Sequence, residues 1–66
     1  MNLTELHPAF RIRQAGDGFV IFHWDNPHAC GCLVRSPQRC WEMVLWGCEY
    51  QLPTAAAVIR FLNSRV

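Results

Sequence analysis

The spacing of the apolar residues changes once along this chain, at Pro53. From residue 10 to residue 50, short apolar or alternating runs are separated by turn-forming residues, which is the pattern of antiparallel strands. After Pro53, apolar side chains recur at helical spacing, at Ala55, Val58, Ile59, Leu62 and Val66. The chain therefore predicts an α+β fold, a four-stranded antiparallel β-meander with one C-terminal α-helix packed on one face. A small SH3-like barrel with an appended helix is the alternative.

The first two predicted strands flank a tight turn. Residues 10–14 alternate apolar and basic side chains, so Arg11 and Arg13 face away from the side that Phe10 and Ile12 occupy. Gly16-Asp17-Gly18 is a hairpin signal. The next run, residues 19–24, is apolar on both faces, which is typical of a covered central strand.

The other two predicted strands flank a second turn. The third strand lies within residues 30–35, and Ser36-Pro37-Gln38-Arg39 fits a type I turn. The fourth strand is expected to run almost without interruption over residues 40–50. On one such strand Glu42 and Glu49 differ by an odd number of positions and would face opposite sides.

A chain of 66 residues predicts one domain: an N-terminal arm or short helical turn over residues 1–9, the meander over 10–50, and the helix over 53–64 with Thr54 as its N-cap. So short a chain buries only about 60% of its surface. Charged residues make up 17% of it, against about 25% in ordinary domains. We therefore expect some apolar surface to contact another molecule.

Charge and the N-terminal sequence narrow the function classes. A net charge of +1 indicates neither a strongly basic nucleic-acid binder nor an acidic mimic of nucleic acid. The N-terminus has no basic and apolar signal region, and no apolar run approaches the ~20 residues that cross a bilayer. We expect a cytoplasmic, reducing location, no membrane partner, and cysteines that remain thiols.

The cysteines and one histidine are the candidates for a metal site. Four candidate ligands are His28, Cys30, Cys32 and Cys40, and Cys48 follows them. Zinc sites usually use ligand pairs such as Cys-x-x-Cys, and no such pair occurs here. We expect neither metal nor another cofactor, although a zinc-stabilised small domain stays as an alternative.

Catalysis has little support in the sequence. Asp25, His28 and Cys30 contain the residue types of a nucleophilic triad, but triads are assembled around a pocket from distant segments. A domain of this size seldom encloses a cleft of several hundred Å³. The sequence therefore predicts a protein that is not an enzyme.

The tryptophans favour a binding function. Trp41 and Trp46 are five positions apart and would face opposite sides of one strand, whereas a single helix covers only one sheet face. Tryptophan and arginine are enriched in interface hot spots. The predicted partner-binding residues are Trp24, Trp41, Trp46, Arg11, Arg13 and Arg39.

We expect a non-catalytic protein-binding module that acts sterically as an inhibitor, adaptor or regulator, of the kind found in phages or mobile elements, or that self-associates. Its partner is then another protein or its own copy. A nucleic-acid-binding module that uses Arg11, Arg13 and the aromatic residues is the alternative.

Overall fold

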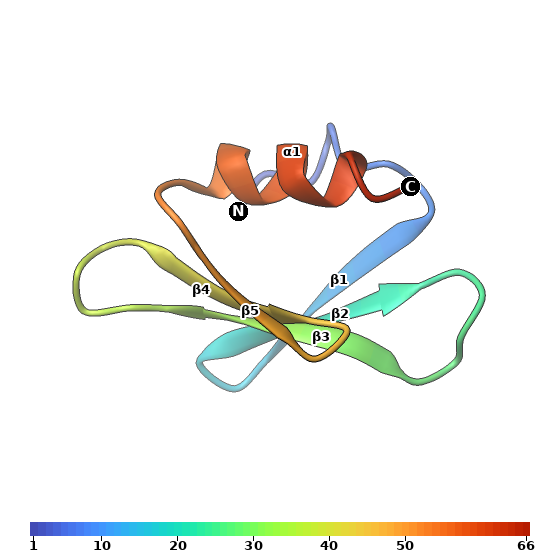
Figure 1. Ribbon diagram of the computed structural model, residues 1–66, viewed down its shortest axis with the longest axis horizontal. Coiled ribbons are helices and arrows are strands. Elements are labelled where there is room, and N and C mark those ends of the chain that lie inside the picture. The colour runs from blue at the N-terminus through green and yellow to red at the C-terminus, as the bar shows by residue number, and fades with distance from the viewer.

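The computed structural model describes residues 1–66. Its strands are β1 (Phe10–Ala15), β2 (Gly18–His23), β3 (Ala29–Arg35), β4 (Trp41–Leu45) and β5 (Cys48–Leu52), and its helix is α1 (Ala55–Asn63). The strands form one antiparallel sheet in chain order, and α1 lies across one face of it (Figure 1). The predicted α+β meander with one C-terminal helix is confirmed. The barrel alternative is wrong, because β1 and β5 remain two separate edges.

The sheet has one strand more than predicted. The segment expected to be one long strand over residues 40–50 folds back on itself at Trp46 and Gly47, whose φ angles are 48° and 80°. Two successive residues with positive φ form a type I′ turn, which joins β4 to β5. Such turns favour Asn-Gly or Asp-Gly, so a tryptophan at the first position concealed the turn from the sequence pattern.

The two predicted turns are present. Ala15 pairs with Gly18 across the β1–β2 turn, which has a positive φ of 59° at Gly16. Between β3 and β4, the amide of Arg39 donates to the carbonyl of Ser36 at 3.0 Å, which closes the predicted turn. Arg39 itself has a φ of 64°, the left-handed residue that completes a three-residue hairpin loop.

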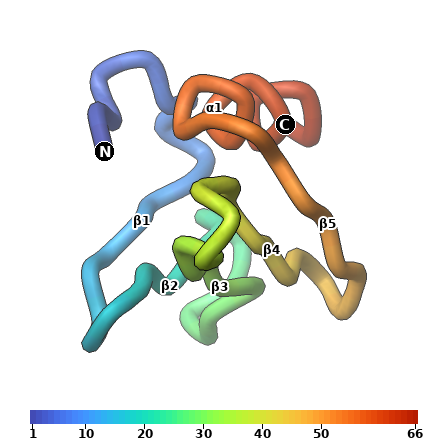
Figure 2. The backbone as a smooth tube through the Cα atoms, turned by 90° about the vertical axis from the view of Figure 1, so that its left-hand side faces the viewer, coloured from blue at the N-terminus to red at the C-terminus, as the bar shows by residue number.

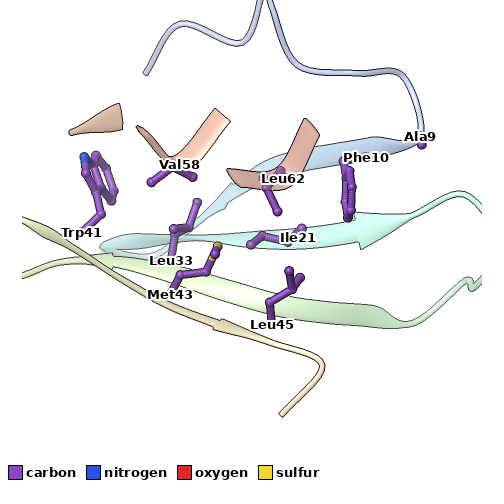
Figure 3. Close-up of a cluster of buried hydrophobic side chains, with 9 residues drawn as sticks. All are labelled: Ala9, Phe10, Ile21, Leu33, Trp41, Met43, Leu45, Val58 and Leu62. Carbon is purple, nitrogen blue, oxygen red and sulfur yellow. The ribbon is translucent and has the colours of Figure 1, made fainter. Parts of the chain in front are cut away.

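The core lies between the sheet and α1. Figure 3 shows the strand side chains that point from the sheet toward Val58 and Leu62 of the helix; they are Phe10, Ile21, Leu33, Trp41, Met43 and Leu45. The predicted N-cap is confirmed, because the Thr54 hydroxyl accepts a hydrogen bond from the Ala57 amide at 3.1 Å. Val66, predicted to extend the helical stripe, lies beyond the end of α1 and is exposed.

The N-terminal arm, residues 1–9, lies on the same side of the sheet as α1 (Figure 2). The side chain of Asn63 fastens it there: its oxygen accepts from the His7 amide and its nitrogen donates to the Glu5 carbonyl, each at 2.8 Å. Leu6 packs against the core. The arm and α1 together cover the inner face, and no element of the chain covers the outer face (Figure 1).

Candidate functional site

Two of the three tryptophans meet at one end of the sheet. Trp24 follows the last residue of β2, and Trp46 occupies the β4–β5 turn. The ring of His23 lies between them, with its centroid 5.8 Å from each indole ring. Phe10 packs against His23 at 5.0 Å and against Trp46 at 6.0 Å. We call these four residues the aromatic patch.

The patch has two rings that are largely buried and two that are exposed. Phe10 is buried and the His23 side chain is 12% exposed, whereas Trp24 is 74% and Trp46 53% exposed. Strand pairing brings the two buried rings together, because Phe10 lies opposite His23 in the β1–β2 register. The amide of Trp46 donates to the Cys30 carbonyl at 2.9 Å, which holds the β4–β5 turn beside β3.

His23 has a carboxylate partner that the sequence did not indicate. Its Nδ1 lies 2.5 Å from Oδ1 of Asp25. His28 makes no such contact, and its exposed backbone amide donates to the Asn26 side chain instead. His23 and Asp25 are two positions apart where the predicted strand over residues 19–24 ends, and this spacing was the available signal.

Cys30 is not positioned as an activated nucleophile. It is the extra residue of a β-bulge, since Gly31 pairs with Ile21 while Ala29 pairs with Phe22. Burial raises the pKa of the Cys30 thiol, and the nearby Asp25 carboxylate raises it further. A raised pKa keeps sulfur protonated, whereas nucleophilic cysteines need the thiolate. The residues Asp25, His28 and Cys30 do not form the triad considered from the sequence, because Asp25 pairs with His23.

Trp41 has a structural position. It is 7% exposed, packs against Phe19 at 5.9 Å between ring centroids, and has the Arg35 guanidinium 5.3 Å from its ring centroid. It pairs with Arg35 at the end of the strands opposite to the aromatic patch, where the turn with Arg39 also lies. The prediction that Trp41 and Trp46 face opposite sides of one strand is wrong, because a turn begins between them.

Arg11 and Arg13 lie on the outer face, as their alternation in β1 predicted. Both are exposed, and the Arg13 guanidinium lies 5.7 Å from the centroid of the Phe22 ring. They are therefore not part of the aromatic patch. The structure brings together Trp24 and Trp46 out of the six predicted contact residues and places the other four elsewhere.

The outer face also carries both strand carboxylates. Glu49 pairs with Val44, and Gln51 pairs with Glu42, so Glu42 and Glu49 share this face. The prediction that they face opposite sides is wrong, because the turn at Trp46 and Gly47 reverses the chain between them. A shallow hollow of about 480 Å³ lies beside them, lined by Cys32, Val34, Glu42, Met43, Val44, Glu49, Tyr50 and Gln51. It does not include His23 or Asp25.

The predicted metal-ligand candidates are dispersed. His28 is exposed in the β2–β3 connection, Cys32 is exposed on the outer face, and Cys30 lies in the bulge. Cys40 contacts the Ser36 hydroxyl at 3.1 Å and the Gln51 amide nitrogen at 3.2 Å. No three His, Cys, Asp or Glu side chains are grouped so that they could hold one metal ion. All four cysteines are free.

Comparisons of the chain with protein-family models, curated proteins and solved structures found no match. The one helix, α1, has nine residues, and no helix of the protein has the length and apolar character needed to cross a membrane.

Proposed function

We propose that this protein is a non-catalytic protein-binding module and that the aromatic patch is its contact surface. The observation that carries the proposal is the pair of indole rings, 74% and 53% exposed, each packed against His23. Tryptophan is one of the residue types enriched among interface hot spots, where a few residues supply most of the binding energy. In a domain with so little core, two such side chains left at the surface favour a contact role.

The backbone of Trp46 supports the same proposal. A bulky residue with positive φ is uncommon and costs of order 1–3 kcal/mol. At this position asparagine or glycine would form the type I′ turn with less strain. Since the strain does not serve the turn, it favours a role for the indole ring itself.

The patch is suited to binding because its aromatic rings already pack against one another in the free chain. The Trp46 ring packs against Phe10 and His23, and the Trp24 ring packs against His23. Side chains ordered before binding lose less entropy in the complex. A module of this kind acts sterically, by covering or bridging a protein surface as an inhibitor, adaptor or regulator.

Nucleic-acid binding has less support. The exposed tryptophans belong to the aromatic patch, whereas Arg11 and Arg13 lie on the outer face with Glu42 and Glu49. The two carboxylates offset the two guanidinium groups, and surfaces that bind single strands combine stacking rings with a net positive groove.

The test is affinity capture from a lysate of the cells that produce the protein. Immobilised wild type is compared with Trp24→Ala, Trp46→Ala and, as a matched control on the outer face, Val34→Ala. Truncation of a hot-spot tryptophan costs about 2 kcal/mol or more, so each tryptophan variant should weaken the affinity for a specific partner roughly thirtyfold and reduce its recovery.

Circular dichroism spectra must first establish that all variants are folded. Retention of the partner by Val34→Ala and its loss from both tryptophan variants would support the proposal. Equal recovery of every captured protein by wild type, Trp24→Ala and Trp46→Ala would refute it.

A further inference from the structure

The outer face carries a row of side chains that is complementary to itself. Paired residues of five neighbouring strands form the row, which reads Arg13, Val20, Cys32, Val44 and Glu49 from β1 to β5. Two valines flank the central cysteine symmetrically, and the two ends have opposite charges. When the row is followed from β5 to β1 instead, its central apolar residues are the same and its positive and negative ends are exchanged.

Two further charges lie on opposite sides of the row, Arg11 toward the Ala29 end of β3 and Glu42 toward its Val34 end. Arg11 adds a second positive charge on β1, and Glu42 adds a second negative charge on β4. Val34 is 49% exposed, and Phe22 is half-buried beneath Arg13. One edge of the outer face is thus basic, the opposite side is acidic, and the centre is apolar. A sheet face of this kind is normally covered by a second layer, which this chain does not supply.

We propose that a second copy of this chain covers the outer face, related to the first by a two-fold axis parallel to β3 and close to Cys32. This proposal goes beyond the proposed function and does not depend on it, because the aromatic patch lies outside the row. Rotation about that axis places β1 of one copy over β5 of the other. Arg13 then faces the partner's Glu49, Val20 faces the partner's Val44, and the two Cys32 side chains approach each other.

The charges select this arrangement over its competitor. A two-fold axis perpendicular to the strands would place β1 over β1 and the arginines of both copies against each other, which is repulsive. The parallel axis instead forms the same complementary contact twice, as an isologous interface requires. Two sheets packed in this way would form an aligned β-sandwich with the helices on its outside.

The size of the face sets the strength of the dimer. Four inter-strand spacings of about 4.8 Å, and about five residues per strand at about 3.3 Å each, give an area of roughly 19 by 17 Å. Such a face has a footprint of roughly 320 Å² on each copy, or about 650 Å² for two copies, which is below the roughly 1,200–2,000 Å² buried in specific interfaces. The dimer should therefore be concentration-dependent, and salt should weaken it because its charged pairs lie at the rim.

Charge reversal tests the proposal directly. One variant combines Arg11→Glu with Arg13→Glu, and the other combines Glu42→Arg with Glu49→Arg. Each alone places like charges in contact between residue 13 of one copy and residue 49 of the other, at both ends of the interface. Each should weaken the dimer by about tenfold or more, as measured by sedimentation equilibrium. An equimolar mixture of the two should form a heterodimer at least as readily as wild type forms its dimer.

Two controls separate this surface from others. Arg39→Glu combined with Arg60→Glu changes the net charge as the first variant does, but away from the row, and should leave the dimer intact. Trp24→Ala should also leave it intact, although the same variant tests the proposed binding function.

A short bifunctional thiol reagent should cross-link two copies in the wild type and in Cys48→Ser, but not in Cys32→Ser.

The proposal is overturned if the wild type is a monomer at every concentration and salt. A dimer that survives both charge reversals, or one that Trp24→Ala disrupts, would also overturn it, because another surface would then hold the copies together. Loss of partner capture by Trp24→Ala with an intact dimer would support both surfaces independently.

Discussion

Replacing Trp46 separates two effects that the native residue combines. The indole ring packs against Phe10 and His23, which stabilises the fold, while the backbone at the same residue has a φ of 48°, which destabilises it. Trp46→Ala removes the packing and keeps the unfavourable backbone. Trp46→Asn removes the same packing but supplies a residue that adopts this conformation readily.

The magnitudes follow from exposure and conformation. The residue is 53% exposed, so a little less than half of about 250 Å² of tryptophan surface is buried. At about 25 cal/mol per Å², the lost burial destabilises the fold by at most about 3 kcal/mol. Alanine in the left-handed region costs about 1–2 kcal/mol. We therefore expect Trp46→Asn to be more stable than Trp46→Ala by about 1 kcal/mol.

Urea denaturation followed by circular dichroism measures this difference. A domain of this length has a total stability of roughly 3–10 kcal/mol, so a change of 1 kcal/mol is resolvable. Trp24 provides the matched control: it is exposed like Trp46, but its φ is not positive. Trp24→Asn and Trp24→Ala should agree within about 0.5 kcal/mol. Equal stability of Trp46→Asn and Trp46→Ala would refute the left-handed turn and the strain argument built on it.

Four further predictions concern the rest of the fold. Asn63→Ala removes two hydrogen bonds to the N-terminal arm and should cost about 1–2 kcal/mol; amide exchange at His7 should accelerate, and unchanged exchange would contradict the role of Asn63. Gly31→Ala should unfold the protein or lower its melting temperature far more than Gly16→Ala, because a Cβ at Gly31 would overlap the Val44 carbonyl oxygen whereas a Cβ at Gly16 has open space. At mildly alkaline pH, alkylation of Cys30 followed by mass spectrometry should lag behind that of the exposed Cys48, because burial raises the pKa of the Cys30 thiol and reduces its thiolate fraction. The same raised pKa means that the folded state holds this proton more tightly than the unfolded chain, so stability present at neutral pH should decline as the pH rises through the thiol range, and Cys30→Ala should remove that part of the decline.

Local physical chemistry determined much of the fold from the sequence alone. The helix follows from its apolar spacing and from Thr54, whose hydroxyl caps an amide only three residues away. The two predicted hairpin turns depend on Gly16 and on Ser36-Pro37, which act within four residues. The outward position of Arg11 and Arg13 follows from the period of a strand. Each of these features depends on neighbours in the sequence, so a local pattern predicts it.

Only the tertiary structure decided the turn at Trp46 and Gly47. Tryptophan does not favour a left-handed backbone, and the apolar run over residues 40–50 suits one long strand as well as two short ones. The chain reverses there because β5 pairs with β4 and brings Leu52 and Tyr50 against the core, contacts that the local sequence does not encode. That reversal places Glu42 and Glu49 on one face.

The two candidate surfaces depend on long-range register for the same reason. Trp24 and Trp46 meet at His23 only because β1, β2, β3 and the β4–β5 turn are aligned at one end of the sheet. The row from Arg13 to Glu49 likewise needs four successive strand pairings. A shift of one residue in any pairing would turn its side chains to the other face. The sequence alone determined which residues have binding chemistry, and strand register decided which of them share a surface.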